Sequence, residues 1–349
     1  KLLGCAPMHL PEEMVHAAGV TPVVLQPGHE PITLGHSYFY SFFCGYVRGT
    51  MDLFLKGSFD FVDGVAFPDT CLQMRGLCSI LRDKWQHYLE FMQLPADVRK
   101  PDALPVTLKA LRVFQKSLEE WTGRRIAAKD FRESILLYNE SRSLMRQFYH
   151  LCRERPGLLR PREIQAVALS SLLWPKEEQK TLLRSLLKEL EGHRTSAPDK
   201  ARLFLSGHLC HAPQPEVLDL VDKAGGVVVN DDLYAGYRSI ASDVAVDGKP
   251  LEALGRRYLA NFPPCPTRSD NESDWGRYLV ESARSSRAQG VVVLLVKFCE
   301  PHIFYYPHLR HALEAAKIPH LVLETEHELT ALEAERTRLQ AFVEMIGKS

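Results

Sequence analysis

The sequence predicts an α/β fold with parallel sheets, and three observations carry this prediction. Short apolar segments alternate with helix-like segments near both ends of the chain, as in βαβ units. The run at residues 291–298 is apolar except for Lys297, which is typical of a strand covered on both faces. The chain has 349 residues, too many for one ordinary core, so two domains are expected.

The first predicted domain covers residues 1–103. Pro11 and the acids after it favour a helix start, because proline fits the first turn and carboxylates suit the positive end of the helix dipole. An aromatic stretch at residues 38–55 predicts a helix that carries Cys44, and a further helix is expected at residues 71–86. The predicted strands are residues 2–6, 21–26, 64–68 and 87–94.

Residues 104–195 are predicted to form a helical connecting region, and residues 196–349 a second α/β domain. Charged residues lie opposite apolar stripes in the connecting region, as amphipathic helices require. Prolines separate its helices, which are expected at residues 104–121, 128–153, 162–173 and 175–192. The last domain is expected to have strands at 202–206, 226–230, 291–298 and 320–324, and helices at 215–224, 274–288, 306–316 and 328–345.

Composition excludes several classes of function. Lys plus Arg and Asp plus Glu both number 43, so we expect no broad basic surface for nucleic acid or an anionic membrane. There is no apolar stretch of the ~20 residues that a membrane span needs, and no visible signal peptide. Eight scattered cysteines predict a reducing cytoplasm, with thiols free or bound to metal. Glycine-rich dinucleotide and Walker A motifs are absent, so ATP hydrolysis by this chain is not expected.

Two cysteines directly follow apolar strands. Cys71 comes after residues 64–68 and Cys299 after residues 291–298. Ligand sites gather at the carboxyl ends of such strands, and thiolates are soft metal ligands. With Cys44 they form a candidate ligand set for a metal or iron–sulfur site between the two α/β domains. Three cysteines suit a [4Fe–4S] cluster with one iron left open. The alternative is that each cysteine simply packs as a small buried residue.

Other residues indicate less specific chemistry. Cys78, Cys210 and Cys265 are candidate ligands of a larger cluster or packing cysteines, and Cys5 and Cys152 are expected to be structural. His208 and His211 have too few companions for a zinc site. His302, His308 and His311 are candidate proton donors or surface residues. Asp231 is a candidate ribose ligand or helix cap. Arg336 and Arg338 are candidate phosphate ligands or solvated charges.

Several motifs, in order along the chain, resemble the benzoyl-CoA reductase / 2-hydroxyglutaryl-CoA dehydratase subunit family. They are PEEMVHAAGVTPV at 11–23, FFCGYVR at 42–48, DGVAFPDTC at 63–71, KFCEPH at 297–302 and RTRLQAFVEM at 336–345. The segments GHLCHAP at 207–213, DDLYAGYR at 231–238 and CEPHIFYYP at 299–307 are most similar to the smaller cluster-bearing (C-type) subunit of ATP-dependent benzoyl-CoA reductase. Leu72 follows Cys71 where many relatives have Asp, which removes one acid beside that ligand.

This resemblance implies two flavodoxin-like parallel-sheet domains with a [4Fe–4S] cluster held by Cys44, Cys71 and Cys299. It implies a sister subunit of the same fold, an iron–sulfur ATPase pair, ferredoxin as electron donor and an aromatic acyl-CoA substrate. The implied reaction is dearomatisation of benzoyl-CoA to a cyclohexadiene carbonyl-CoA. The alternatives are a subunit of a 2-hydroxyacyl-CoA dehydratase, or a non-catalytic scaffold subunit. Six cysteines also leave open a double-cubane cluster.

Overall fold

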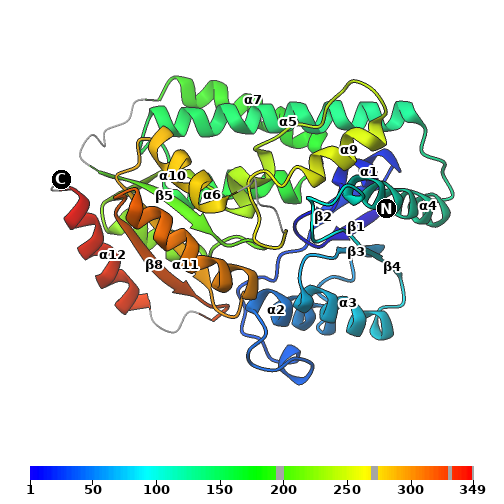
Figure 1. Ribbon diagram of the computed structural model, residues 1–349, viewed down its shortest axis with the longest axis horizontal. Helices are drawn as coiled ribbons and strands as arrows, with labels where there is room; N and C mark the ends of the chain where they lie inside the picture. Colours follow the sequence, from blue (N-terminus) through cyan, green and yellow to red (C-terminus); the bar gives the residue numbers. More distant parts are fainter. Residues whose placement is uncertain (194–199, 269–273, 329–331, 348–349) are drawn as a thin grey trace.

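In the computed structural model, the chain forms two four-stranded parallel sheets with helices on their faces (Figure 1). The structure describes residues 1–193, 200–268, 274–328 and 332–347. The first sheet contains β1 (Leu2–Cys5), β2 (Thr21–Val24), β3 (Gly64–Pro68) and β4 (Tyr88–Met92). The second contains β5 (Ala201–Gly207), β6 (Gly226–Asp231), β7 (Gly290–Val296) and β8 (His320–Thr325).

The two sheets share one topology. Their orders are β2-β1-β3-β4 and β6-β5-β7-β8, which are both the 2-1-3-4 order of flavodoxin-like sheets. The predicted fold class is therefore confirmed. Strands β3 and β7 are buried along their whole length, as their unbroken apolar sequence predicts. The central pairs are β1 and β3 in one sheet and β5 and β7 in the other, and between the two strands of each pair the order in which strands are added to the sheet reverses.

The helix predicted at residues 38–55 is wrong at its start. Residues 35–37 form a short 3-10 turn, η1 (Gly35–Ser37), and helix α2 begins only at Gly45 (Gly45–Leu55). The backbone N–H groups of residues 33–35 donate to the Asp52 carboxylate at 2.9, 2.6 and 2.9 Å, which holds this loop against α2. Cys44 has the extended backbone of an N-cap residue (φ −62°, ψ 151°), so the helix cannot include it.

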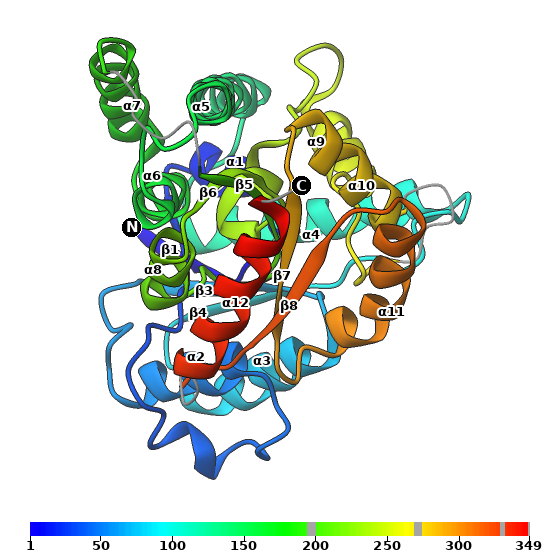
Figure 2. The same ribbon diagram turned by 90° about the vertical axis from the view of Figure 1, so that its left-hand side faces the viewer.

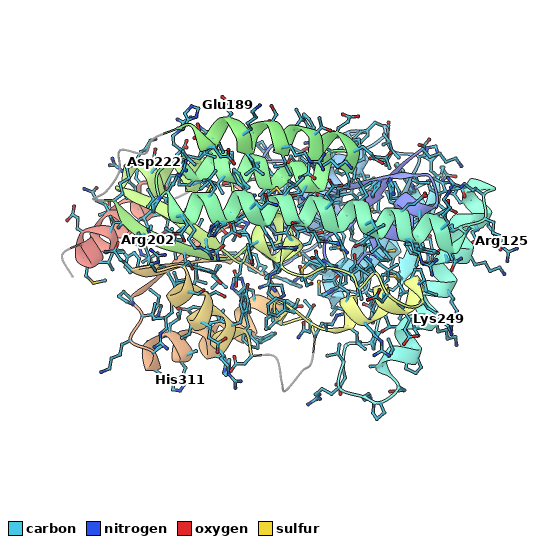
Figure 3. The ribbon with its side chains drawn as sticks, turned by 90° about the horizontal axis from the view of Figure 1, so that it is seen from above. Arg125, Glu189, Arg202, Asp222, Lys249 and His311 are labelled. Carbon is cyan, nitrogen blue, oxygen red and sulfur yellow. The ribbon has the colours of Figure 1, made fainter. Side chains whose placement is uncertain are left out.

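The other helices of the first half are α1 (Glu12–Ala17) and α3 (Leu72–Lys84), as the sequence predicts. The four predicted connecting helices are present as α4 (Ala103–Thr122), α5 (Ala128–Glu154), α6 (Pro161–Leu173) and α7 (Lys176–Glu191). Helix α5 contacts both α1 and β6, and α6 contacts both β2 and α8, so this layer touches both sheets. Seen from above, α5 and α7 lie side by side along the molecule (Figure 3). The division into domains at 103 and 195 remains a prediction, and position 195 lies outside the described residues.

The helices that follow β5 in the chain include α9, which packs against α4 and α5 and which the sequence analysis missed. They are α8 (Pro215–Lys223), the π-type turn η2 (Tyr234–Arg238), α9 (Pro250–Leu259), α10 (Trp275–Ser285), α11 (Glu300–Ala315) and α12 (Leu332–Gly347). Helix α9 was missed, although Pro250 in its first turn is a start signal. Figure 2 shows α8 and α12 on one side of the sheet, and α10 and α11 on the other.

Two predicted helix starts in this half differ from the structure. Helix α11 begins at Glu300 rather than at residue 306, because Pro301 suits a first turn and the helix continues through Pro307. The described part of the last helix begins at Leu332, and residues 329–331 of the predicted range lie outside the described residues. Within the described chain, every helix is too short or too polar to cross a membrane.

A buried ion pair joins the first sheet's layer to the connecting helices. Arg142 of α5 donates to the Glu13 carboxylate of α1, and the side chains are 8% and 0% exposed. Burial alone would raise the pKa of Glu13, but Arg142 and Arg257 outweigh it and hold that pKa at about 2. A lowered pKa means that the pair stabilises the fold above pH 4.5, and that this contribution is lost as the pH falls towards about 2.

Replacing Arg142 with Met should destabilise the protein strongly, because the Glu13 carboxylate is then buried without its partner. We expect a loss of about 3–5 kcal/mol in the free energy of unfolding, measured by urea denaturation. The double variant Glu13→Leu/Arg142→Met should recover most of this loss, since apolar residues can replace a buried pair. As a surface control, Arg124→Met, which breaks the pair with Asp130, should cost about 1 kcal/mol or less. Equal losses for the two Arg→Met variants would contradict this role.

Candidate functional site

A small cavity lies where loops from the two sheets meet. Its lining includes Met8, which follows β1, and Cys71, which follows β3. From the second sheet come Cys210, which follows β5, and Cys299, which follows β7. Each sheet therefore contributes residues from the ends of its two central strands, where flavodoxin-like sheets bind ligands. Cys44, which precedes α2, completes a set of four thiols around the cavity.

Three of these cysteines occupy the same local position. Cys44, Cys71 and Cys299 are the N-cap residues of α2, α3 and α11. Burial raises the pKa of all three thiols, and backbone N–H groups from the first turn of each helix partly oppose this rise. These groups are those of Val47 and Tyr46 at Cys44, Met74 and Gln73 at Cys71, and His302 at Cys299. Helix N-termini stabilise negative charge, so the three thiols lie where bound thiolates would be stabilised.

Burial acts in the opposite direction. Burial raises the pKa of Cys44 well above its usual value, and the nearby thiols of Cys299 and Cys71 raise it further. Burial also raises the pKa of Cys299, to about 12. The thiols are therefore neutral at physiological pH unless a cationic group binds them, because a coordinated metal deprotonates its thiol ligands. All eight cysteines lie in described segments and are free, so no disulfide competes for them.

The spacing of these thiols does not suit a single metal ion. Within the part of the chain that the structure describes, no three His, Cys, Asp or Glu side chains are grouped to hold one ion. The four thiols instead surround a space, which matches the donor set of a multi-iron cluster. The free volume is about 20 Å³, enough for little more than one water. A cluster would therefore have to displace flexible lining side chains such as Met8 and Met74.

One buried side chain links all three cysteine-bearing segments. Gln73 lies in the first turn of α3, two residues after Cys71, and is 5% exposed. Its Oε1 accepts the backbone N–H of Cys44 at 2.7 Å, and its Nε2 donates to the carbonyl of Phe298 at 2.9 Å. Because both ends of the amide are used, Gln73 sets the positions of the Cys44 and Cys299 backbones relative to Cys71.

A close contact next to Cys44 also joins the two halves. A Cβ on Gly45 would lie 2.6 Å from the Cβ of His327, in the segment after β8. Only glycine lets α2 approach this segment so closely. Arg48 of α2 reaches Glu326 of the same segment at 3.5 Å. The N-terminus of α2 is thus held against the second sheet's side of the cavity.

Comparison with known proteins identifies the family. Residues 7–346 match the family model described as 2-hydroxyglutaryl-CoA dehydratase, D-component. The chain belongs to this family. This confirms the resemblance seen in the sequence motifs, and the match extends over nearly the whole chain.

Three curated relatives are similar to the chain at comparable levels. The C-type subunit of benzoyl-CoA reductase from Thauera aromatica is 25% identical over 350 residues, which cover 99% of this chain and 91% of that protein. The (R)-phenyllactyl-CoA dehydratase beta subunit of Clostridium sporogenes is 26% identical over 348 residues, 99% and 92% of the two chains. The beta subunit of (R)-2-hydroxyglutaryl-CoA dehydratase from Acidaminococcus fermentans is 27% identical over 360 residues, again 99% and 92%. All three are subunits of multi-subunit enzymes.

Of the further cysteines, Cys210 alone lines the cavity. Burial raises its pKa, and the nearby Cys299, Cys71, Cys44 and Cys265 thiols raise it further. Cys265 lines a neighbouring pocket, from which its thiol also raises the pKa of Cys299, and Cys78 packs in the core between α3 and the first sheet. Cys5 and Cys152 are buried among hydrophobic residues. The structure thus gathers four thiols at the cavity, rather than the six considered for a double cube.

The histidine candidates do not line the cavity. The rings of His208 and His211 lie 4.7 Å apart in the loop after β5, and the buried His208 contacts Thr325. His302 is fully buried beside Trp275, with ring centroids 5.2 Å apart. On the outer side of α11, His308 contacts Asp274 at 3.0 Å and His311 is exposed.

The charged candidates have structural partners. Asp231 accepts the backbone N–H groups of Leu233 and Tyr237 at 3.1 and 2.8 Å, so it caps the turn after β6 rather than facing a ligand. Burial raises the pKa of Asp231 to about 7. On α12, Arg336 pairs with Glu333 and Arg338 with Glu335. The sequence analysis missed Gln73 and Met8 altogether, because no local pattern marks a side chain that acts across the fold.

Replacing Gln73 with Leu should loosen the cavity, because the Cys44 N–H and the Phe298 carbonyl lose their buried partner. Each unpaired group costs about 1–3 kcal/mol, so local opening should become on the order of tenfold more frequent or greater. The measurement is the rate at which a maleimide labels Cys44 and Cys299, followed by peptide mass spectrometry. Gln340→Leu, which removes an exposed amide on α12, is the matched control. The bridging role fails if both variants are labelled at the wild-type rate.

Proposed function

We propose that this chain is the iron–sulfur subunit of a multi-subunit enzyme that acts on acyl-CoA thioesters, and that Cys44, Cys71 and Cys299 bind its [4Fe–4S] cluster. The observation that carries the proposal is the meeting of three cysteine-capped helix N-termini at one buried cavity. Such a cluster supplies single electrons at low potential when bound. The helix N–H groups would stabilise the thiolates, and the buried walls would keep water away.

The fourth thiol makes the proposal more specific. Cys210 belongs to the loop after β5, and unlike the other three it is not at a helix N-terminus. We assign Cys210 to the cavity wall rather than to the ligand set. With only Cys44, Cys71 and Cys299 as ligands, one iron of the cluster stays open to another ligand. A single cube suits the four thiols gathered here better than a double cube, since Cys78 and Cys265 lie outside the cavity.

For the reaction, we propose ATP-dependent reduction of an aromatic acyl-CoA, as in benzoyl-CoA reductase. The motif resemblance at residues 207–213, 231–238 and 299–307 supports this, as does the similarity to a benzoyl-CoA reductase subunit. A sister subunit of the same fold, an iron–sulfur ATPase pair and ferredoxin would complete the electron supply in the cytoplasm. The second candidate is a 2-hydroxyacyl-CoA dehydratase, which the family model and two dehydratase beta subunits favour.

Iron and sulfide analysis after strictly anaerobic purification tests the cluster. We expect about four irons per chain in the wild type. Cys299→Ser should lose most of the iron, because it removes one of three ligands, whereas Cys152→Ser, in a distant hydrophobic core, should keep it. A wild-type protein that is colourless and free of iron would favour the scaffold alternative, and about eight irons would favour the double cube.

Turnover with purified partner subunits separates the two reactions. A reductase should consume reductant in proportion to the benzoyl-CoA that disappears. A dehydratase should convert a 2-hydroxyacyl-CoA with only catalytic amounts of reductant, because its electron is returned after each turnover. Both thioesters should be assayed with the same complex and the same ATPase. Dehydration with catalytic reductant, and no loss of benzoyl-CoA, would overturn the reductase proposal.

A further inference from the structure

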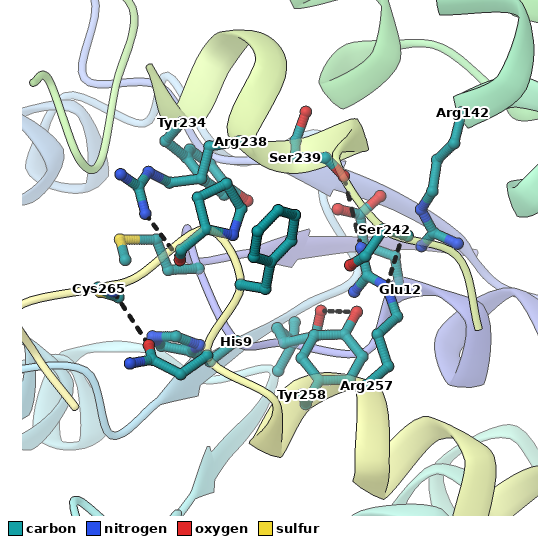
Figure 4. Close-up of a pocket in the computed structure, with 15 residues that line it drawn as sticks. His9, Glu12, Arg142, Tyr234, Arg238, Ser239, Ser242, Arg257, Tyr258 and Cys265 are labelled. Carbon is teal, nitrogen blue, oxygen red and sulfur yellow. Dashed lines mark hydrogen bonds between the residues drawn. The ribbon is translucent and has the colours of Figure 1, made fainter. Parts of the chain in front are cut away.

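The cysteine cavity has to widen before it can take a cofactor of several atoms. Its free volume of about 20 Å³ holds little more than one water, whereas a [4Fe–4S] cluster consists of four irons and four sulfides. A neighbouring pocket, of about 110 Å³, is bordered by Cys265 and His9 (Figure 4), so the additional space lies outside the set of four thiols. The contacts that hold the cavity walls together therefore determine how readily the cavity opens.

The segment after β8 holds the two halves together beside the cavity. Strand β8 runs towards α2 (Figures 1 and 2), and residues 326–328, which we call the strap, follow it directly. The side chain of His327 fills a notch made by two glycines one turn apart on α2. A Cβ on Gly45 would lie 2.6 Å from the His327 Cβ, and a Cβ on Gly49 would lie 2.8 Å from its Cε1. In this notch, the His327 Nε2 donates to the carbonyl of Glu30 at 2.8 Å.

The first residue of the strap is joined to both ends of the proposed ligand set. Glu326 accepts from the Arg48 Nη2 at 3.5 Å and from the Lys297 Nζ at 3.3 Å. Arg48 is buried on α2, and its Nε donates at 2.8 Å to the carbonyl of the residue before Cys44. Lys297 lies two residues before Cys299. The strap thus connects two segments that carry proposed ligands, one from each half of the molecule.

The contacts of the strap are individually weak. The side chains of Glu326 and Lys297 are 30% and 41% exposed, and ion pairs with such exposure contribute little to stability. Glu328, which is exposed, accepts from the backbone N–H of Ile32 at 3.3 Å. By contrast, β3 and β7 are buried along their whole length. Segments held mainly by exposed polar contacts open at a lower free energy than the whole protein unfolds, so the strap can release while both sheets stay folded.

We propose that the strap must release before the cysteine cavity can take up its cofactor. In the closed state, the strap holds the N-terminus of α2, and with it Cys44, against the second sheet. Release of the strap frees α2 to move and widens the space between Cys44 and Cys299. The identity of the cofactor as an iron–sulfur cluster rests on the proposed function, whereas the release of the strap does not.

Maleimide labelling of the full-length chain, before iron is supplied, tests the strap. Peptide mass spectrometry follows each cysteine separately. Glu326→Gln keeps the size of the side chain and removes its charge, so Cys44 and Cys299 should be labelled about two- to tenfold faster. Cys152, in a distant hydrophobic core, reports global unfolding, and its labelling rate should not change. Glu333→Gln, which breaks an exposed pair on α12, is the matched control and should be labelled like the wild type.

Gly49→Ala separates release of the strap from loss of stability. The added Cβ displaces the His327 ring from its notch, while alanine is a better helix former than glycine. Labelling of Cys44 should again be about two- to tenfold faster, because the hydrogen bond of the ring is lost. Gly76→Ala on α3 is the control, since its Cβ would meet one atom at 3.9 Å, and it should not raise the rate. Wild-type labelling of Cys44 in the Glu326→Gln or the Gly49→Ala variant, or an equal rise at Cys152, overturns the proposal.

Iron uptake during anaerobic reconstitution connects the strap to the proposed function. Glu326→Gln should take up iron faster than the wild type and reach the same final content, because Glu326 is not a ligand. Equal rates of uptake contradict a role of the strap in cofactor entry. A chain that binds no iron but shows the faster labelling refutes the proposed function alone, and a chain that binds iron with unchanged labelling in the variants refutes this inference alone.

Discussion

The hydrogen bonds of Gln73 are the contact on which the geometry of the cysteine cavity depends. The three proposed ligands lie at the N-termini of three different helices, α2, α3 and α11. They are distant in sequence, from Cys44 near the start of the chain to Cys299 near its end. Gln73 reaches both of the other segments from α3, through the N–H of Cys44 and the carbonyl of Phe298. A buried amide with both ends paired favours one arrangement, because any displacement leaves a polar group without a partner.

Two opposing effects act on the pKa of the thiols that line the cavity. Burial and the proximity of like groups disfavour thiolates, while the N–H groups at three helix N-termini favour them. Without a cation the first effect dominates, and the thiols stay protonated. The site is thus built to hold negative charge only when a positive group accompanies it, which is a property expected of a cofactor site rather than of a reactive cysteine.

The duplicated topology explains why two cavities lie side by side. In each sheet the strand order reverses between the two parallel central strands, and the loops that follow these strands project from the same edge. When the two edges meet, the loops after β3, β5 and β7 and the N-terminus of α2 enclose the cysteines, and Met8 in the loop after β1 lines both this cavity and the neighbouring pocket. In this short loop Met8 and His9 both have a positive φ, at 66° and 58°, which is a strained conformation for residues other than glycine.

The sequence by itself determined the α/β class, the eight strands and most helices, because hydrophobic periodicity and proline positions are local signals. It also singled out Cys71 and Cys299, since a cysteine directly after a buried parallel strand must lie at the ligand-binding edge. Only the tertiary structure decided that Cys210 lines the cavity with them while Cys78 and Cys265 do not, and that Gln73 links their backbones. These facts depend on contacts such as those that Gln73 makes with residues 29 and 225 positions away, and such contacts leave no periodic trace in the chain.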